Sequence, residues 1–135
     1  MMRVLVSALS CNPNYGSEGL VGYKYAEALA RRHAVTVLAS PPAQTPGGTR
    51  LYSINAGSCN FNDVDAGPLA RFELRQLQTA WSLHRRQRFQ LVHRVTPSWI
   101  GNASVLAALN VPLVVGPLLA ADRPPESKLS LRLFV

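Results

Sequence analysis

The residues most suited to chemistry begin in a short loop that joins an apolar run to an amphipathic one. This loop extends from Asn12 to Gly19 and includes Gly16, Ser17 and Glu18. A loop that leads from a buried strand into a helix presents backbone N–H groups without intrahelical partners, and such groups favour an anion. The glycines would let a phosphate or sugar oxygen approach the main chain closely, and Glu18 could hold a sugar hydroxyl. The structural alternative is that the glycines only allow a tight turn and helix packing, while Glu18 stabilises the helix dipole.

A second set of polar residues stands at the end of a later apolar run. His93, Arg94 and Thr96 lie within one short stretch, and Asn12 stands at the corresponding end of the first apolar run. A histidine at a strand end can orient an acceptor hydroxyl or a donor phosphate, and an arginine can bind an anion. The alternative is a hydrogen-bonded core histidine beside a solvated arginine.

Gly116 and the two cysteines complete the candidates. Gly116 follows the last apolar run, where it either lets a ligand approach or only reverses the chain. Cys11 and Cys59 do not form a disulfide framework, and neither has a Cys or His at metal-ligand spacing, so we expect no metal site and a reducing, cytoplasmic setting. Cys11 is interpreted as a small buried residue because no His stands near it to act as a base.

The charge balance favours anionic partners. Fourteen basic residues, twelve of them arginine, face seven acidic ones, which gives a net charge of +7. Such a field suits sugar nucleotides, phospholipid headgroups or nucleic acid, unless the excess charge is merely scattered over the surface. Arginines on the segment 71–88 resemble a patch for an acidic membrane, with a solvated helix face as the alternative. No aromatic residues interleave with them, so we do not expect a nucleic-acid partner.

The elements that position these residues follow from the apolar pattern. Short apolar runs predict strands over 4–9, 34–39, 50–54, 89–95 and 111–115. Helical spacing predicts helices over 18–32, 67–86 and 100–109, the first with Ser17 as its N-cap and arginines in its last turn. The face of the second helix is predicted to carry Leu69, Phe72, Gln76, Leu77, Ala80 and Trp81. Strand and helix alternate, so we expect one α/β domain, a Rossmann-like doubly wound parallel sheet. Ligands of such sheets bind at the carboxyl edge, where Gly16, His93 and Gly116 should surround a shared hollow.

The order of these segments resembles the opening of family 4 retaining glycosyltransferases, and the resemblance covers nearly the whole chain. The segments that carry it are Arg3–Ala8, Cys11–Pro13, Gly16–Glu18, Val21–Gly22, Glu27–Ala30, Val35–Leu38, Phe89–Thr96 and Val111–Leu118. The resemblance implies a GT-B architecture, in which two Rossmann-like domains enclose an active site that uses a nucleotide-activated sugar and no catalytic metal or other cofactor. It places His93 near the transferred sugar as the catalytic residue. The residues it places at the donor are Gly16, Ser17, Glu18, Gly19 and Gly116, and those at the acceptor are Asn12, Arg94 and Thr96.

The chain departs from the family pattern in three places. Leu118–Ala121 replaces a run of glycines, and Val95 stands where many relatives have a second histidine. The family's carboxyl-terminal domain, which holds most of the nucleotide and supplies a pair of glutamates, is expected to be absent from this chain. We therefore expect residues 1–135 to be the amino-terminal, acceptor-side domain, with an incomplete tail over 118–135 and no transferase activity alone.

The alternative function is a non-catalytic ligand-binding or partner domain that a second chain completes. A dehydrogenase half is disfavoured because the G-x-G-x-x-G pattern does not follow the first strand. The expected setting is the cytoplasm, with peripheral contact at the inner membrane face kept open, because the apolar start over 1–9 is too short for a signal or a membrane span. The expected partners are a nucleotide-sugar donor and an acceptor among lipid-linked sugars, polysaccharides and small molecules.

Overall fold

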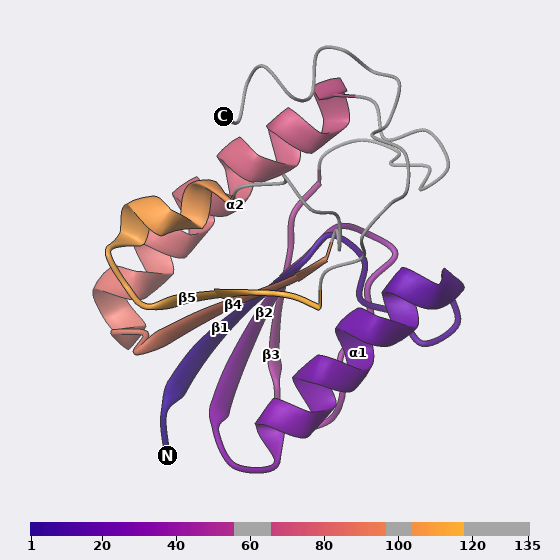
Figure 1. Ribbon diagram of the computed structural model, residues 1–135, viewed down its shortest axis with the longest axis horizontal. Coiled ribbons are helices and arrows are strands. Elements are labelled where there is room, and N and C mark those ends of the chain that lie inside the picture. The colour runs from indigo at the N-terminus through magenta and orange to yellow at the C-terminus, as the bar shows by residue number, and fades with distance from the viewer. Residues whose placement is uncertain (56–65, 97–103, 118–135) are drawn as a thin grey trace.

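A five-stranded, all-parallel sheet lies between two long helices (Figure 1). The computed structural model describes residues 1–55, 66–96 and 104–117. Its elements, in chain order, are β1 (Arg3–Ala8), α1 (Gly16–Ala30), β2 (Ala34–Ala39), β3 (Arg50–Ser53), α2 (Ala66–Gln87), β4 (Leu91–Thr96), a 3₁₀-helix η1 (Val105–Leu109) and β5 (Leu113–Val115). The expected Rossmann-like α/β domain with a doubly wound parallel sheet is confirmed.

The strand order places a topological switch point in the middle of the sheet. The order is β3-β2-β1-β4-β5, so the chain steps outward from β1 in one direction and from β4 in the other. β1 and β4 are direct neighbours, and Val6 lies opposite His93. The register shifts by one residue after Ser7, so that Ala8 lies opposite Thr96. The loops that leave β1 and β4 therefore separate at the carboxyl edge, where open α/β sheets bind ligands.

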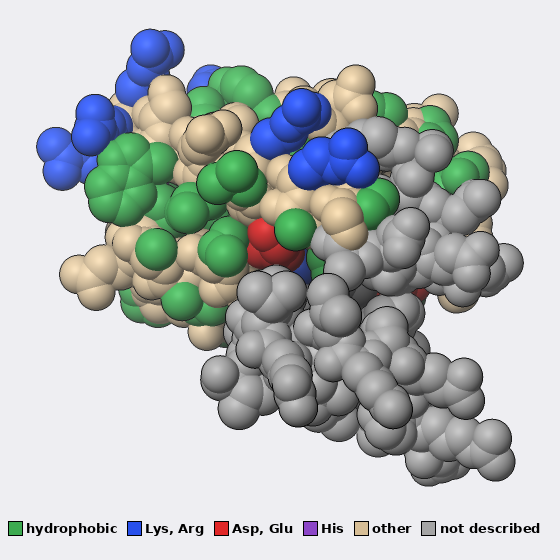
Figure 2. Space-filling model, turned by 90° about the horizontal axis from the view of Figure 1, so that it is seen from above, with side chains coloured by type: hydrophobic (Ala, Val, Ile, Leu, Met, Phe, Trp, Pro, Cys, Tyr) green, Lys and Arg blue, Asp and Glu red, His purple; other side chains and the backbone are tan. Residues whose placement is uncertain are grey.

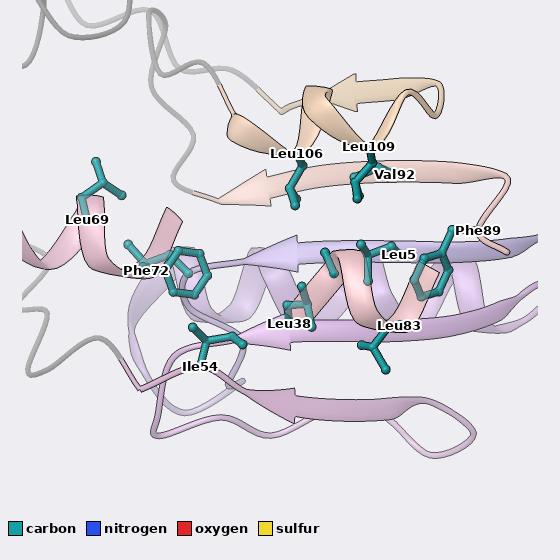
Figure 3. Packing of buried hydrophobic residues seen from close by; sticks show 12 residues of the cluster. Leu5, Leu38, Ile54, Leu69, Phe72, Leu83, Phe89, Val92, Leu106 and Leu109 are labelled. Atoms are coloured by element: carbon teal, nitrogen blue, oxygen red, sulfur yellow. The ribbon is translucent and has the colours of Figure 1, made fainter. Parts of the chain in front are cut away.

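Each face of the sheet has its own apolar core, because successive strand residues point to opposite faces. Under α2 the core includes Leu5, Leu38, Phe72 and Val92 (Figure 3). Under α1 it includes Val4, Val6, Val35, Val37 and Val95. Burial on both faces explains why β1 and β2 read as largely apolar runs rather than as alternating ones.

Helix α1 packs very closely on the end of β1. A Cβ built on Gly19 would lie 2.5 Å from the carbonyl oxygen of Asn12, and one on Gly22 would overlap the carbonyl oxygen of Ser10. Only hydrogen atoms fit in these gaps, so both positions require glycine for packing. This contact fixes the position of α1, and with it the loop that precedes the helix.

The ends of α1 differ from the prediction. The helix begins at Gly16, its N-cap is Tyr15 without a side-chain cap bond, and Ser17 lies inside the first turn, so the predicted Ser17 N-cap is wrong. The helix ends at Ala30, which leaves Arg31 at the C-cap and no basic residue in the last turn. Arg31 and Arg32 therefore lie beyond the last turn in which the dipole argument placed them.

The predicted apolar face of α2 is correct except for one residue. Leu69, Phe72, Gln76 and Ala80 are buried, whereas Trp81 is 45 % exposed. The guanidinium of Arg85 lies 5.9 Å from the Trp81 ring centroid, within range of a cation–π contact. Figure 2 shows the molecule from the side on which α2 lies, with Lys and Arg side chains next to exposed hydrophobic ones. The predicted membrane contact of this surface stays a prediction.

The last described elements differ from the prediction. β5 covers only Leu113–Val115, and the described part of the expected helix over 100–109 is the 3₁₀-helix η1, which Ser104 caps by accepting a hydrogen bond from the Leu106 N–H. Cys59, Leu118–Ala121 and the rest of the predicted tail lie outside the described residues. Within the described residues, no helix combines the length and apolarity that a membrane span requires.

Candidate functional site

Hydrogen bonds join the carboxyl ends of β1 and β4. The Leu9 N–H donates to the Thr96 carbonyl at 3.2 Å, and the Ser10 N–H donates to the Thr96 hydroxyl at 3.3 Å. That hydroxyl donates in turn to the Ser10 carbonyl at 3.3 Å. Thr96 is fully buried. Its side chain is thus explained by its contacts with β1, and its predicted acceptor role stays a prediction.

Asn12 organises the loop that follows β1. Its Oδ1 accepts from the Asn14 N–H at 3.0 Å, and its Nδ2 donates to the Pro42 carbonyl at 3.4 Å. The Asn12 N–H donates to the Gly19 carbonyl at 3.0 Å, which ties the loop to α1. Because Asn12 is buried and its amide bonds within the protein, the structure assigns it a loop-forming role, and acceptor binding remains a prediction.

The start of α1 is the most open of the predicted binding segments. Gly16 has a φ of +72°, a conformation that L-residues with side chains rarely adopt, and a Cβ built there would meet nothing within 4 Å. Gly16 and Ser17 are exposed, and Glu18 is half-buried. A ligand can therefore approach the helix end at Gly16. Gly19, by contrast, is buried against Asn12, so packing already accounts for its lack of a side chain.

His93 lies on the α1 face of β4 and bonds to Gly116. Its Nε2 lies 2.9 Å from the Gly116 carbonyl oxygen, and the Tyr25 ring of α1 meets the imidazole edge-on with centroids 5.3 Å apart. Because a carbonyl can only accept, Nε2 carries the proton in this contact, and in a neutral ring Nδ1 holds the lone pair. Gly116 is held from the other side as well, since its N–H donates to the Arg94 carbonyl at 3.0 Å.

Arg94 lies on the opposite face and forms a buried ion pair with Glu73 of α2. The side chains of Arg94 and Glu73 are 0 % and 3 % exposed. Arg94 Nη1 also donates to the Ser104 hydroxyl at 3.2 Å. Glu73 Oε2 accepts from Gln76 Nε2 at 2.9 Å and from the Val105 N–H at 3.3 Å. The interpretation of Arg94 as a solvated arginine is wrong, because a buried carboxylate neutralises it inside the fold.

Burial and neighbouring carboxylates shift the pKa of Arg94 in opposite directions. Desolvation lowers the pKa of Arg94 from its usual value, while the charge of Glu73, a hydrogen bond to Glu73 and the more distant charge of Glu18 raise it. An arginine keeps its proton under such opposing influences at neutral pH. Its Nε and Nη2 are buried, and neither forms a hydrogen bond with a described residue. The buried charge of Arg94 is therefore compensated mainly by Glu73.

The structure brings together only some of the predicted site residues. His93 bonds to Gly116 beneath α1, the helix that Gly16 begins. Tyr25, which contacts His93, is nine residues from Gly16, so the helix start lies roughly 13 Å further along the α1 axis than this contact. The side chain of Arg94 lies on the opposite face of the sheet from that of His93. The site is thus an α1-side arrangement of a helix start, a histidine and a glycine turn, without the Arg94 side chain.

Sequence reasoning did not identify the partners of these residues. Glu73 and Gln76 bond to each other at i,i+3 on the buried face of α2, and the Ser7 hydroxyl of β1 donates to Gln76 Oε1 at 2.6 Å. A carboxylate on an apolar helix face is the one sequence signal that predicts a buried partner of opposite charge. Tyr25 gave no such signal, since an aromatic residue at helical spacing is typical of any core.

Cys11 is predicted to be unreactive in the folded protein. It is fully buried, its Sγ contacts the Gln44 carbonyl at 3.3 Å, and burial raises its pKa from 9.0 to about 11. At pH 8 about one Cys11 thiol in a thousand is then a thiolate, the form that attacks disulfide reagents. In a Cys59→Ser variant, where Cys11 is the remaining thiol, we expect negligible reaction with Ellman's reagent until the protein is unfolded in guanidinium chloride. Stoichiometric reaction of the native protein within minutes would show that this interpretation is wrong.

Comparison with solved structures relates the fold to a glycosyltransferase. The chain superimposes on SsfS6, a glycosyltransferase from Streptomyces sp. SF2575, with a TM-score of 0.52 and 20 % identity over 85 % of this chain. The same enzyme in complex with thymidine diphosphate gives a TM-score of 0.49 with 23 % identity. This chain spans 39 % of the length of SsfS6. No protein-family model matches the sequence, and no curated protein is similar enough to count as a match.

Proposed function

We propose that this chain is the acceptor-side, amino-terminal domain of a retaining GT-B glycosyltransferase, which transfers a sugar from a nucleotide-sugar donor to an acceptor hydroxyl. One observation carries the proposal: the open helix start at Gly16 and the bonded pair of His93 and Gly116 belong to one face and one edge of a sheet whose switch point lies between β1 and β4. That edge is where α/β sheets bind ligands. The likeness of the fold to a glycosyltransferase supports the same conclusion.

The donor's diphosphate is assigned to the start of α1. The first N–H groups of a 15-residue helix and its dipole favour a negative charge, and the absence of a side chain at Gly16 leaves the approach open. Ser17 is exposed in the first turn and supplies a hydroxyl donor. Glu18 is half-buried there and suits a sugar hydroxyl better than a phosphate, since a carboxylate repels phosphate charge.

The transferred sugar and the acceptor are assigned to the side of His93. With Nε2 bonded to the Gly116 carbonyl, the ring is fixed in orientation, and Nδ1 is left as the acceptor for a hydroxyl proton. The bond also couples the ring to the turn after β5, so a ligand that contacts Gly116 will influence the position of His93. His93 is 9 % exposed, so a reacting group can contact only a small part of the ring.

The complete active site requires a second domain. One wall of a cleft neither excludes water nor orients the donor from both sides, and those two effects provide most of the catalytic rate enhancement in such sites. This chain spans 39 % of the length of SsfS6, so the activity of a whole enzyme is proposed only for the assembled protein. We expect the chain alone to bind donor weakly and to transfer no sugar.

Amide chemical shifts recorded during titration with nucleotide sugars test the donor assignment. We expect UDP-, GDP- and dTDP-sugars to shift the amide signals of Gly16–Gly19 and Gly116, with weak affinity because half of the cleft is missing. A Gly16→Val variant should weaken binding about tenfold, a loss of about 1.4 kcal/mol, because a side chain then occupies the approach to the helix start. Radiolabelled donor and a panel of sugar acceptors should give no transfer by the chain alone.

Gly48→Val is the matched control for Gly16→Val. Gly48 also has a positive φ, +83°, with nothing within 4 Å of a built Cβ, but it lies in the loop before β3. Both substitutions therefore impose the same kind of backbone strain, and only the first blocks the proposed donor site. Because Gly48 also lines a hollow at the opposite, amino edge of the sheet, the affinities compared are those read from the amide shifts of residues 16–19. Equal weakening by both variants, or shifts that avoid residues 16–19, would contradict the donor assignment. Binding at those residues without transfer after addition of a second domain would favour the non-catalytic alternative.

A further inference from the structure

A hollow of about 550 Å³ lies at the amino edge of the sheet, opposite the edge that carries the candidate site. Four arginines line it: Arg3 at the start of β1, Arg50 at the start of β3, and Arg86 and Arg88 at the end of α2. These segments are far apart in the sequence, and the parallel sheet brings them together because all its strands begin at this edge (Figure 1). Volumes of this size are typical of small-ligand pockets.

The charge around the hollow is of one sign. Among the described residues that line it, four are arginines and none is acidic. The negative end of the α2 dipole opposes them with about half a charge, and only near the last turn. Two of the carbonyls there already accept hydrogen bonds, that of His84 from the Arg88 N–H at 2.8 Å and that of Arg88 from Arg3 Nε at 3.1 Å. The four arginine charges outweigh the partial negative charge at the end of α2, so the hollow favours an anion.

Helix capping does not account for the whole set. Arginines in or after the last turn of α2 stabilise its dipole, which explains Arg86 and Arg88 without a ligand. Arg3 bonds to the Arg88 carbonyl at the end of α2, whereas Arg50 begins β3, where no dipole requires a cation. Their approach to the end of α2 brings like charges together, an arrangement that costs free energy unless an anion offsets it. Polar lining is also present, since the Thr36 hydroxyl donates to Gln87 Oε1 at 3.0 Å beside the hollow.

We propose that this amino-edge hollow binds a phosphate-bearing anion, at a site separate from the proposed donor site. The planar guanidinium group matches phosphate oxygens with two parallel hydrogen bonds, and several such groups select for multiply charged phosphate over a monovalent anion. A free polyphosphate and the phosphate of an acidic lipid headgroup share this chemistry. The inference does not depend on the proposed function, because it uses the opposite edge of the sheet.

Pyrophosphate binding, measured by isothermal titration calorimetry on the 135-residue chain, tests the proposal. We expect binding at low ionic strength that weakens as salt is added. The double variant Arg50→Gln, Arg86→Gln should bind about tenfold more weakly or worse, because two charge-assisted contacts are lost. Arg3 and Arg88 are left unchanged because they bond to each other. Circular dichroism melting should show that the double variant is folded, since exposed Arg→Gln changes alter stability little.

The matched control is Arg31→Gln, Arg32→Gln. These exposed arginines follow α1 and do not line the hollow, but their removal changes the net charge by the same amount. We expect the control to bind pyrophosphate less than about twofold more weakly than the wild type, through the long-range field alone. Equal weakening in both double variants would show that pyrophosphate binding depends on the overall positive charge rather than on this hollow, and would overturn the proposal.

Vesicles distinguish the two sources of phosphate. Co-sedimentation with phosphatidylglycerol vesicles is compared with phosphatidylcholine vesicles for the wild type and both double variants. Pyrophosphate binding without vesicle binding supports a free anion as ligand. Vesicle binding that Arg50→Gln, Arg86→Gln abolishes and the control retains supports a lipid headgroup. Absence of both pyrophosphate and vesicle binding in the wild type would overturn the proposal.

Discussion

Replacing Glu73 by Gln is expected to lower the free energy of unfolding by about 3–5 kcal/mol, the cost of leaving a buried charge without its partner. Arg94 is wholly buried, and Glu73 is the carboxylate paired with it. The substitution keeps the size of the side chain and an oxygen for the Val105 N–H, so the lost charge dominates the effect. Urea unfolding, followed by circular dichroism, measures the shift of the midpoint.

A double-mutant cycle separates the ion pair from other effects of these residues. Arg94→Met alone is also expected to destabilise the domain, since it leaves the Glu73 carboxylate buried without a cation. The combined variant Glu73→Gln, Arg94→Met contains neither charge, so its loss of stability should be smaller than the sum of the single losses by about 2 kcal/mol or more. Additive losses, or single losses below about 1 kcal/mol, would show that water reaches the pair and that its charges are not compensated by each other.

Gly22→Ala is expected to destabilise the domain by about 1–3 kcal/mol through overpacking. The added methyl group overlaps the Ser10 carbonyl and lies 3.3 Å from the Ala8 Cβ, so α1 must move away from the end of β1. Helix propensity alone favours alanine over glycine by about 1 kcal/mol, so a net loss would demonstrate the steric term. Chemical denaturation gives the size of the loss. Because α1 carries Gly16 and Tyr25, nucleotide-sugar affinity should fall together with stability.

Gly47→Ala serves as the control for this packing argument. A Cβ at Gly47 meets nothing within 4 Å, so alanine should leave the stability within about 0.5 kcal/mol of the wild type. If Gly22→Ala proves as stable as Gly47→Ala, the close approach of α1 to β1 does not limit the fold. The assignment of Gly19 to packing rather than to ligand binding would then lose its support as well.

Much of the fold was predictable from local patterns. The run Val35–Leu38 is apolar and rich in β-branched residues, and the strand there has the predicted limits, Ala34–Ala39. The apolar spacing of Leu69, Phe72 and Ala80 likewise predicted the buried face of α2. Element ends were less accurate, as Ser17 shows, because caps depend on backbone angles that many sequences satisfy equally well. Trp81 was misplaced since a large aromatic residue at the margin of the apolar face is compatible with either side.

The candidate site was predictable only as a set of strand ends. Parallel strands all end at one edge, so Asn12, His93 and Gly116 had to lie toward the same edge of the sheet whatever the details of packing. The contact between His93 and Gly116 requires β4 and β5 to pair in one register, which a single sequence does not specify. The partner of Glu73 was equally unpredictable, because its pairing with Arg94 depends on where α2 crosses the sheet.

By itself, the sequence determined an alternating α/β domain, because apolar runs of strand length separated by amphipathic segments leave few other ways to bury the apolar residues. It also required the neighbours His93 and Arg94 to point to opposite faces, since side chains alternate along a strand. Only the tertiary structure decided which face each residue meets: α1 and the turn at Gly116 for the histidine, α2 and Glu73 for the arginine. Those contacts join segments far apart in the chain, and their geometry depends on packing and register rather than on local preference.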